Sequence, residues 1–306
     1  MLYDIIIIGA GPAGVTAAVY AARQKLNLLM ISKDMGGQIA KKAVDIENYP
    51  GFDKISGPDL IKTFEEQLKT NKVEIAFDEV LKITREDKKF HIATKSGKIY
   101  ESLTVIVSTG ADPRPLEAEG EKEFIGKGVS YCALCDGPIF RDKTVAVVGG
   151  GNSGFETALF LSNYVKKIYI LEFGKEVKAD KENKDLIAKT GKAEVITSAK
   201  VLKIQGDNFV KSVTFENQQT KEQKTLDLDG VFVEIGYSPA TAFVKDLVEF
   251  SERDEIVTDL ESYATKTPGL FAAGDCNKGR YKQIITAAGE GAKAALAAYD
   301  YILKNK

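Results

Sequence analysis

The sequence predicts an α/β protein in which one structural unit is present twice. An apolar run typical of a buried strand, a glycine-rich turn and an alanine-rich helical stretch follow one another in residues 4–24, and the same order returns from residue 144. The two turns align with an offset of 140 residues, from Gly9 to Gly149, and no gap is needed through the helices that follow. A strand, a glycine turn and a helix in this order form the dinucleotide-binding unit of Rossmann-like domains. We therefore predict two such domains.

Both glycine turns have the spacing G-x-G-x-x-G. Glycines at these places permit a tight turn and a close approach of the backbone to a pyrophosphate at the N-terminus of the helix. Such a turn can also join a strand to a helix without any ligand, and this alternative is stronger for the second copy. The predicted binding residues are Gly9, Gly11, Pro12, Ala13 and Gly14 in the first turn, and Gly149, Gly151, Asn152, Ser153 and Gly154 in the second.

The residue at the end of the second strand of each unit bears on which nucleotide is bound. An acid at this position commonly holds a ribose. The first copy has Ser32 there, so we expect the ribose contact to come from backbone groups or from Ser32 itself. The second copy has Glu172, whose carboxylate would accept hydrogen bonds from a free 2′-hydroxyl and repel a 2′-phosphate. This favours NADH over NADPH.

The arrangement of the two domains follows from what lies after each unit. Alternating stretches at residues 90–94 and 210–215 fit small antiparallel meanders. The C-terminal segment has no nucleotide unit of its own, so we expect it to return and complete the first domain. The predicted fold has two Rossmann-like domains of the three-layer ββα type, with residues 115–242 inserted between residues 1–114 and 243–306.

Composition and charge exclude several classes of partner. Lys and Arg total 42 against 44 for Asp and Glu, the net charge is −2, and the charges are mixed along the chain. We therefore expect neither nucleic acid nor a membrane surface as a partner. No apolar run approaches the roughly 18 residues that a membrane helix needs, and no basic region precedes the first isoleucine run, so we expect a cytoplasmic protein.

Cys132 and Cys135 form a Cys-x-x-Cys pair, and Asp136 follows directly. Cysteines at this spacing can close a disulfide or form a reactive thiol pair, and an acid beside them can donate a proton. A zinc site wants four ligands, for which the chain offers only this pair, Cys276 and His91, so we expect no metal. A plain buried pair is the other alternative. Redox chemistry is favoured because the pair precedes the second nucleotide unit, and Cys276 is expected to be a small buried residue.

Several motifs in a fixed order make the chain resemble the low-molecular-weight thioredoxin reductases over nearly its whole length. They are residues 9–14, 36–38, 47–51, 109–110, 132–137, 274–275 and 282–284. The resemblance implies a homodimer with FAD in the domain formed by residues 1–114 and 243–306. It also implies an NAD(P)H-binding-like domain that carries the cysteine pair.

The resemblance further implies roles for individual residues. Cys135 would lie next to the flavin, Cys132 would exchange with the disulfide of a thioredoxin or thioredoxin-like protein, and Asp136 would protonate the departing thiolate. Besides the first glycine turn and Ser32, the implied FAD contacts are Gly37, Gln38, Asn48, Thr109, Gly110, Gly274, Asp275, Lys282, Gln283 and Ile284.

The chain departs from the NADPH-dependent members of that family after the second-domain strand. Those members carry a His-Arg-Arg cluster and a further arginine, where this chain has Glu172, Phe173, Gly174 and Lys178. A branch that resembles this pattern takes electrons from ferredoxin, so we expect reduced ferredoxin as the donor, with NADH second and NADPH third. Whether the second domain binds NAD(P)H is left open. The non-enzymatic alternative is a flavin-binding redox sensor.

Overall fold

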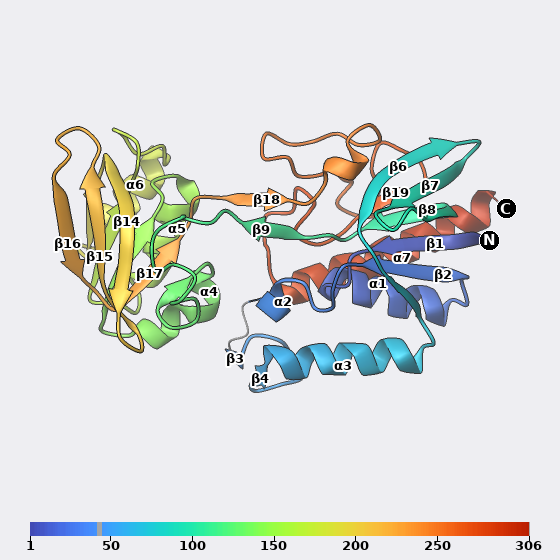
Figure 1. Cartoon of the computed structure of the whole chain (residues 1–306), viewed down its shortest axis with the longest axis horizontal. Coiled ribbons are helices and arrows are strands. Elements are labelled where there is room, and N and C mark those ends of the chain that lie inside the picture. The colour runs from blue at the N-terminus through green and yellow to red at the C-terminus, as the bar shows by residue number, and fades with distance from the viewer. Residues whose placement is uncertain (42–44, 306) are drawn as a thin grey trace. The chain divides into compact units, whose positions relative to one another are not determined.

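Two segments that are far apart in the sequence fold together, and the residues between them form a second body. The computed structural model describes residues 1–41 and 45–305. Met1–Asp112 and Tyr237–Lys306 make up one unit, which we call the discontinuous unit (Figure 1). Pro113–Gly236 make up the other, which we call the inserted unit.

The discontinuous unit combines one large sheet with helices and a small hairpin. Its strands are β1 (Leu2–Ile8), β2 (Leu28–Ser32), β3 (Asp45–Ile46), β4 (Ile55–Ser56), β5 (Glu74–Phe77), β6 (Val80–Glu86), β7 (Lys89–Thr94), β8 (Ile99–Val107) and β19 (Leu270–Ala272). Its helices are α1 (Pro12–Arg23), α2 (Gln38–Lys41), α3 (Gly57–Thr70), the 3-10 turn η2 (Ala242–Val244) and α7 (Ile284–Asn305).

The large sheet has the order β5-β2-β1-β8-β7-β6, with β19 beside β8. Strand β1 pairs in parallel with β2 and with β8, and its isoleucine run at residues 5–8 is buried, as expected for a strand covered on both faces. Strand β8 changes partners along its length. Residues 99–102 pair antiparallel with β7, whereas residues 105–107 pair in parallel with β19. The C-terminal segment thus returns to this sheet.

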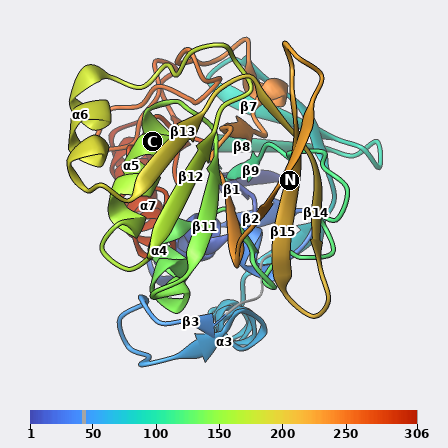
Figure 2. The same cartoon turned by 90° about the vertical axis from the view of Figure 1, so that its left-hand side faces the viewer.

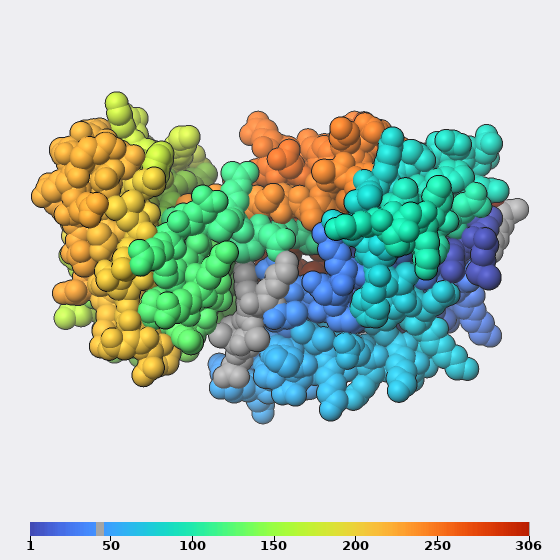
Figure 3. Space-filling model, in the orientation of Figure 1, coloured from blue at the N-terminus to red at the C-terminus, as the bar shows by residue number. Residues whose placement is uncertain are grey.

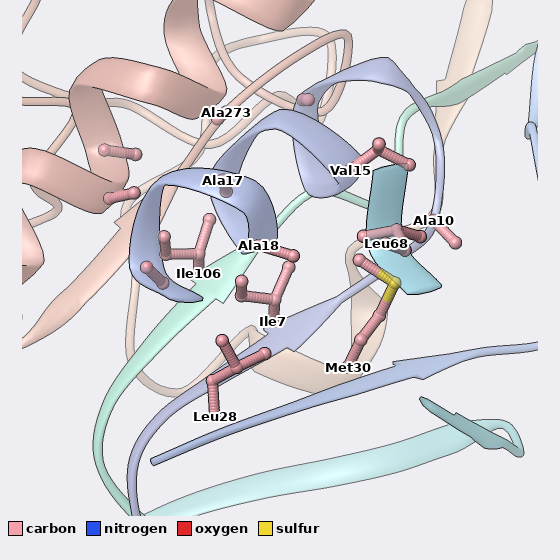
Figure 4. Close-up of a cluster of buried hydrophobic side chains, with 14 of the residues drawn as sticks. Ile7, Ala10, Val15, Ala17, Ala18, Leu28, Met30, Leu68, Ile106 and Ala273 are labelled. Carbon is pink, nitrogen blue, oxygen red and sulfur yellow. The ribbon is translucent and has the colours of Figure 1, made fainter. Parts of the chain in front are cut away.

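Helices α1 and α7 pack closely against each other. A Cβ atom on Gly291 of α7 would lie 2.0 Å from the carbonyl oxygen of Ala13 in α1, so only glycine allows this approach. Figure 4 shows the core beneath α1, where Ala18 of the helix lies over Ile7 of β1. The small residues of both helices therefore bring the first glycine turn and the start of α7 to one end of the sheet.

The inserted unit contains two sheets. Its strands are β10 (Val129–Ser130), β11 (Thr144–Val148), β12 (Lys167–Leu171), β13 (Ala193–Ile196), β14 (Ala199–Gly206), β15 (Val210–Asn217), β16 (Gln223–Asp227) and β17 (Gly230–Val233). Its helices are α4 (Ala133–Asp136), the 3-10 turn η1 (Gly137–Phe140), α5 (Asn152–Leu161) and α6 (Lys181–Lys189). Within the described part of the chain, no helix is both long and apolar enough to cross a membrane.

The inserted unit is built in three layers. The parallel sheet β10-β17-β11-β12-β13 has helix α5 on one face and the antiparallel sheet β14-β15-β16 on the other (Figure 2). Alternation along β11 accounts for the layers, because successive side chains of a strand point to opposite faces. Val145 and Val147 pack in the cluster that contains Phe155 of α5, whereas Ala146 and Val148 pack in the cluster that contains Phe215 of β15.

The chain passes between the units through two paired strands, β9 (Ala111–Pro113) and β18 (Tyr237–Pro239). The Thr109 hydroxyl donates a hydrogen bond to the carbonyl oxygen of Ala240 at 2.8 Å. Gly110, which lies between Thr109 and β9, has a φ of 68° that favours glycine. A hydrogen bond therefore joins the residues just before β9 to the residue just after β18.

The predicted fold class is confirmed, and the two glycine turns have nearly the same geometry. Gly9 and Gly149 have φ values of 106° and 125°, and a Cβ atom on either would lie within 2.4 Å of a backbone carbonyl oxygen. A Cβ atom on Gly14 or on Gly154 would lie 1.9 Å from the carbonyl oxygen of the first glycine of its own turn. Glycine is thus required for the same steric reason in both copies.

Candidate active site

The cysteine pair lies at the start of α4, directly after β10. Cys132 and Cys135 form a disulfide with their Cα atoms 5.3 Å apart. Cys132 is the N-cap of α4, and its Sγ accepts the N–H of Cys135 at 3.2 Å. Cys135 is exposed and Cys132 is half-buried. Two electrons and two protons convert such a disulfide to a dithiol, and a second disulfide can oxidise it again.

Ser130 joins the neighbouring acid to the disulfide loop. Its hydroxyl donates a hydrogen bond to Oδ2 of Asp136 at 2.5 Å and accepts the N–H of Cys132 at 3.0 Å. Ser130 is 5% exposed, so its hydroxyl is shielded from competing water. The Asp136 carboxyl group is thereby held on the same loop as the two sulfur atoms. Ser130 was not predicted from the sequence, because a lone serine in β10 has no distinctive pattern.

A buried carboxylate lies beside the residue that precedes Cys132. Glu121 is 2% exposed and accepts hydrogen bonds from the N–H groups of Leu116 and Glu117, at 2.7 and 2.9 Å, and from the Tyr131 hydroxyl at 2.5 Å. Burial, together with the bond to Glu121, raises the pKa of the Tyr131 phenol, so it stays a donor. The disulfide loop is therefore tied to the segment that follows β9. Glu121 was not predicted either, because it lies in an acidic stretch.

Replacing Tyr131 with Phe should lower the free energy of unfolding by about 1–3 kcal/mol, because the buried Glu121 carboxylate loses one of its donors. Tyr164→Phe is a matched control, since the Tyr164 ring contacts Phe160 and Arg141 rather than a carboxylate. It should change stability by less than about 0.5 kcal/mol. Urea denaturation measures both values. Equal stability of the two variants would contradict the role given to the Tyr131 hydroxyl.

The first glycine turn leaves room for a phosphate. Gly11 is the N-cap of α1, no side chain caps this helix, and a Cβ atom on Gly11 would have no neighbour within 4 Å among the described residues. Pro12 occupies the first position of α1, where its missing N–H is not needed. Gly37 lies alongside, because its Cβ position is 3.5 Å from the Cα atom of Gly11. Ala13 instead packs against α7 and Gly274.

Ser32 is directed at the turn itself. Its hydroxyl accepts the N–H of Ala10 at 3.1 Å and donates to the carbonyl oxygen of Asp34 at 2.7 Å, and the residue is 8% exposed. The single hydrogen of this hydroxyl therefore has a partner within the protein. A ribose contact at this place would have to use the remaining acceptor capacity of Ser32 or backbone groups.

Residues predicted from separate motifs meet near the first turn. Asn48 Nδ2 donates to Oε1 of Gln283 at 3.2 Å, although the two residues are 235 positions apart. Gln38 Nε2 donates to Oδ1 of Asp112 at 2.5 Å. The other amide atom, Oε1 of Gln38, is buried and has no hydrogen-bond partner among the described residues. Buried acceptors are normally hydrogen-bonded, so we expect a ligand to donate a hydrogen bond to Oε1 of Gln38.

Two acids, Glu255 and Glu290, contact the C-terminal motifs at residues 274–275 and 282–284. No sequence motif indicated either acid. Lys282 Nζ donates to the carbonyl oxygen of Asp275 at 3.2 Å and pairs with Oε1 of Glu255, also at 3.2 Å. Gly274, with a φ of 79°, donates its N–H to Oε2 of Glu290 at 2.7 Å. Glu255 and Glu290 lie outside the motifs, 27 and 16 positions from the residues that they contact, and no local pattern revealed them.

The residues of the discontinuous unit fit FAD. The space at Gly11 and the uncapped start of α1 suit a pyrophosphate, and Oε1 of Gln38 is an acceptor that no described residue uses. Ile284 is the first residue of α7 and directly follows Gln283. In the space-filling view, the surface of this unit is hollowed between the blue residues after β2 and the orange residues before α7, and the dark red of α7 shows in the hollow (Figure 3).

The second turn differs because a carboxylate of its own unit is hydrogen-bonded to it. Glu172 accepts the N–H of Gly150 through Oε2 and the N–H of Gly174 through Oε1, both at 2.6 Å. Glu172 corresponds to Ser32 by the 140-residue offset, and Gly150 corresponds to Ala10, so the two copies make the same contact with different side chains. In the second copy, however, the contact places a carboxylate on the turn.

Other polar residues of the second turn are also engaged. Ser153 donates its hydroxyl to Oε2 of Glu234 at 2.6 Å, which puts a further carboxylate beside the first turn of α5. Asn152 exchanges two hydrogen bonds of 2.7 Å with Asp180, the N-cap of α6. Negative charge at this place opposes a pyrophosphate, because like charges repel most strongly where water is partly excluded. Gly151, the N-cap of α5, keeps open space like Gly11.

Cys276 is confirmed as a buried small residue. It is 0% exposed, and burial raises the pKa of its thiol to about 12, so it stays protonated and unreactive. Its Sγ lies 3.4 Å from the carbonyl oxygens of Val107 and Ala273. Within residues 1–41 and 45–305, no group of three or more His, Cys, Asp or Glu side chains has an arrangement suited to a metal ion.

Comparisons with known proteins agree with this architecture. The model of the pyridine nucleotide-disulphide oxidoreductase family matches residues 3–291. An NADH dehydrogenase of Bacillus subtilis is 39% identical over 303 residues, which are 99% of this chain and 59% of that protein. An alkyl hydroperoxide reductase component of Staphylococcus aureus is 39% identical over 304 residues, 99% of this chain and 60% of that protein. The chain thus spans about three fifths of the curated relatives that it matches.

A solved structure covers the chain more evenly. The crystal structure of thioredoxin reductase from Streptococcus pyogenes is 40% identical, has a TM-score of 0.93, and aligns over 99% of both chains. The similarity therefore extends through the inserted unit as well as the discontinuous one.

Proposed function

We propose, since the chain belongs to the pyridine nucleotide-disulphide oxidoreductase family, that it is an FAD-dependent thioredoxin reductase. The observation that carries the proposal is the Cys132–Cys135 disulfide, with the Asp136 carboxyl group held beside it by Ser130. In this proposal, the discontinuous unit is the FAD-binding domain. The inserted unit is a domain of NAD(P)H-binding type that carries the redox pair.

The exchange chemistry uses side chains of the inserted unit. When bound, FAD supplies the two electrons that open the disulfide. The Cys132 thiolate then attacks one sulfur of the thioredoxin disulfide, forming a mixed disulfide and releasing the other sulfur as a thiolate. Asp136 gives that thiolate a proton. The Cys135 thiolate next attacks the Cys132 sulfur, which restores the disulfide and releases the second thioredoxin sulfur as a thiolate. That thiolate takes its proton from water, so thioredoxin leaves as a dithiol.

We propose reduced ferredoxin as the electron donor. The support comes from the second turn, where Glu172 and Glu234 already engage the turn and the start of α5. The stretch after β12 also lacks the arginines that would hold the 2′-phosphate of NADPH. A protein donor can deliver electrons to the flavin without occupying this turn. NADH is the second candidate, because Glu172 suits a free 2′-hydroxyl and because a 39% identical relative is an NADH dehydrogenase.

Anaerobic mixing of the FAD-loaded protein with each donor distinguishes these candidates. Reduced ferredoxin should bleach the flavin absorbance fast, NADH more slowly and NADPH slowest. NADPH should be slower than ferredoxin by a factor on the order of 100, because Glu172 repels its 2′-phosphate. Rapid, saturable bleaching by micromolar NADPH would overturn the donor assignment. It would leave the disulfide chemistry untouched, since that chemistry begins after the flavin is reduced.

The proposal includes three further features that accompany thioredoxin reduction. We expect a homodimer, which gel filtration with light scattering would detect as twice the chain mass. We expect a cytoplasmic setting, because disulfides of cytosolic proteins are usually transient and catalytic, as proposed for this pair. Thioredoxin or a thioredoxin-like protein is the partner, supported by the likeness to the Streptococcus pyogenes thioredoxin reductase.

A further inference from the structure

The first glycine turn, Gly37 and Gln38 form the candidate FAD site, which we call the FAD cradle. The strand that leaves the discontinuous unit contributes a carboxylate to it. Asp112 lies in β9, and its Oδ1 accepts a hydrogen bond from Nε2 of Gln38 at 2.5 Å, across 74 residues of sequence. Gln38 directly follows Gly37, whose backbone lies beside Gly11 of the first glycine turn. A side chain of the connection between the units is therefore joined to the cradle. Asp112 belongs to none of the motifs that predicted the FAD contacts.

The carboxylate decides which way the Gln38 amide faces. The oxygen and the NH2 group of a glutamine amide have nearly the same size, so hydrogen-bond partners determine their places. An ionised carboxylate accepts hydrogen bonds and donates none. Asp112 therefore requires the NH2 group of Gln38 on its side, and the amide oxygen must point away. The reversed amide would set two oxygen atoms against each other at hydrogen-bond distance, which is repulsive.

The opposite end of the amide is where a ligand contact is missing. Oε1 of Gln38 is buried, and the residues that the structure describes offer it no partner. Buried acceptors of this kind are normally hydrogen-bonded. The missing partner must carry a hydrogen, since Oε1 can only accept. FAD carries suitable groups in the ring N–H of its isoalloxazine and in the amino group of its adenine.

We propose that Asp112 is a positioning residue for the cofactor, holding the Gln38 amide so that Oε1 accepts an N–H group of bound FAD. The inference rests on the FAD-binding function proposed above. Asp112 acts through Gln38 and touches no reacting atom. Its effect should therefore appear in cofactor affinity and should vanish when the Gln38 amide is absent.

FAD titration of the apoprotein, followed by quenching of flavin fluorescence, tests the proposal. Asp112→Ala should raise the Kd for FAD about fivefold, because roughly the contribution of one hydrogen bond is lost. Asp112→Asn should stay within about twofold of the wild type, because its side-chain oxygen still accepts from Nε2. Glu123→Ala, which removes an equal charge from an exposed residue, should leave the Kd unchanged. Melting curves of the apoproteins verify that each variant is folded.

A double-mutant cycle with Gln38→Ala completes the test. The double variant should bind FAD no more weakly than Gln38→Ala alone. Independent, additive losses would overturn the proposal, and so would equal losses in Asp112→Ala and Glu123→Ala. FMN and ADP, titrated into Asp112→Ala, locate the contact. Weaker binding of FMN than in the wild type supports a contact to the flavin ring, and weaker binding of ADP supports a contact to the adenine. A wild-type apoprotein that binds no FAD would overturn the proposed function itself, which distinguishes the two failures.

Discussion

Replacing Cys132 with Ser should lower the rate of thioredoxin reduction by about a thousandfold or more, while the flavin is still reduced by its donor at the wild-type rate. A serine hydroxyl is not ionised at neutral pH and cannot attack a disulfide, whereas a cysteine thiolate can. The electron transfer into the flavin precedes this step and does not use the sulfur. Steady-state reduction of thioredoxin and anaerobic bleaching of the flavin measure the two quantities separately.

Cys135→Ser is the matched variant, and it should behave differently. Cys132 would still attack thioredoxin, but no second thiol would resolve the mixed disulfide, so a covalent complex should accumulate and be visible on a non-reducing gel. The comparison is informative because Cys135 is exposed and Cys132 is half-buried in this structure. Trapping by Cys132→Ser instead would assign the exchange to Cys135. A wild-type protein that turns over no thioredoxin with any donor would favour a flavin-binding redox sensor.

Replacing Gly11 with Ala should weaken FAD binding on the order of 100-fold, or about 2.8 kcal/mol. The backbone at Gly11 has φ −78° and ψ −176°, which alanine adopts without strain, and a Cβ there meets no neighbour within 4 Å among the described residues. The added methyl group would instead occupy the space that the pyrophosphate needs. The Kd for FAD, measured on the apoprotein, should rise while the melting temperature changes little.

Gly151→Ala controls for the loss of a glycine N-cap, because Gly151 stands in the same place at the start of α5, with φ −85° and ψ −177°. Its Cβ also meets open space among the described residues. This variant should keep wild-type FAD affinity and wild-type reduction by ferredoxin. A large loss of reduction by NADH in Gly151→Ala would show that a dinucleotide does use the second turn. Unchanged FAD affinity in Gly11→Ala would contradict the placement of the FAD pyrophosphate at Gly11.

Much of the fold could be predicted because its determinants are local. The isoleucine run of β1 and the glycines at 9 and 14 lie within a few residues of one another, and each is demanded by burial or by a carbonyl oxygen that leaves no room for a Cβ. The same pattern at Gly149 and Gly154 made the duplication visible. The return of the C-terminal segment was predicted by elimination, and its pairing with β8 through residues 270–272 is what the structure adds.

The candidate site was predicted only in part. The cysteine pair is recognised by its spacing, whereas Gln38 and Asn48 belong to motifs of the family that the sequence resembles. The acids that support them do not, because Glu121 lies within an acidic stretch and Glu290 lies on a helix otherwise rich in alanine. Nothing in either sequence neighbourhood separates a buried carboxylate with several donors from a solvated one. Burial and partner distances are what distinguish them.

The sequence by itself determined the order of strands, turns and helices, the duplication, and the place of the redox pair on the chain. These depend on periodicity, on steric limits at glycine and on the spacing of two cysteines, all of which act over a few residues. Only the tertiary structure decided how the polar groups are paired. The hydrogen bonds that Gln38 donates to Asp112 and Asn48 donates to Gln283 span 74 and 235 residues. Hydrogen bonds act only over about 3 Å, so such pairs exist only once folding has brought their strands and helices together.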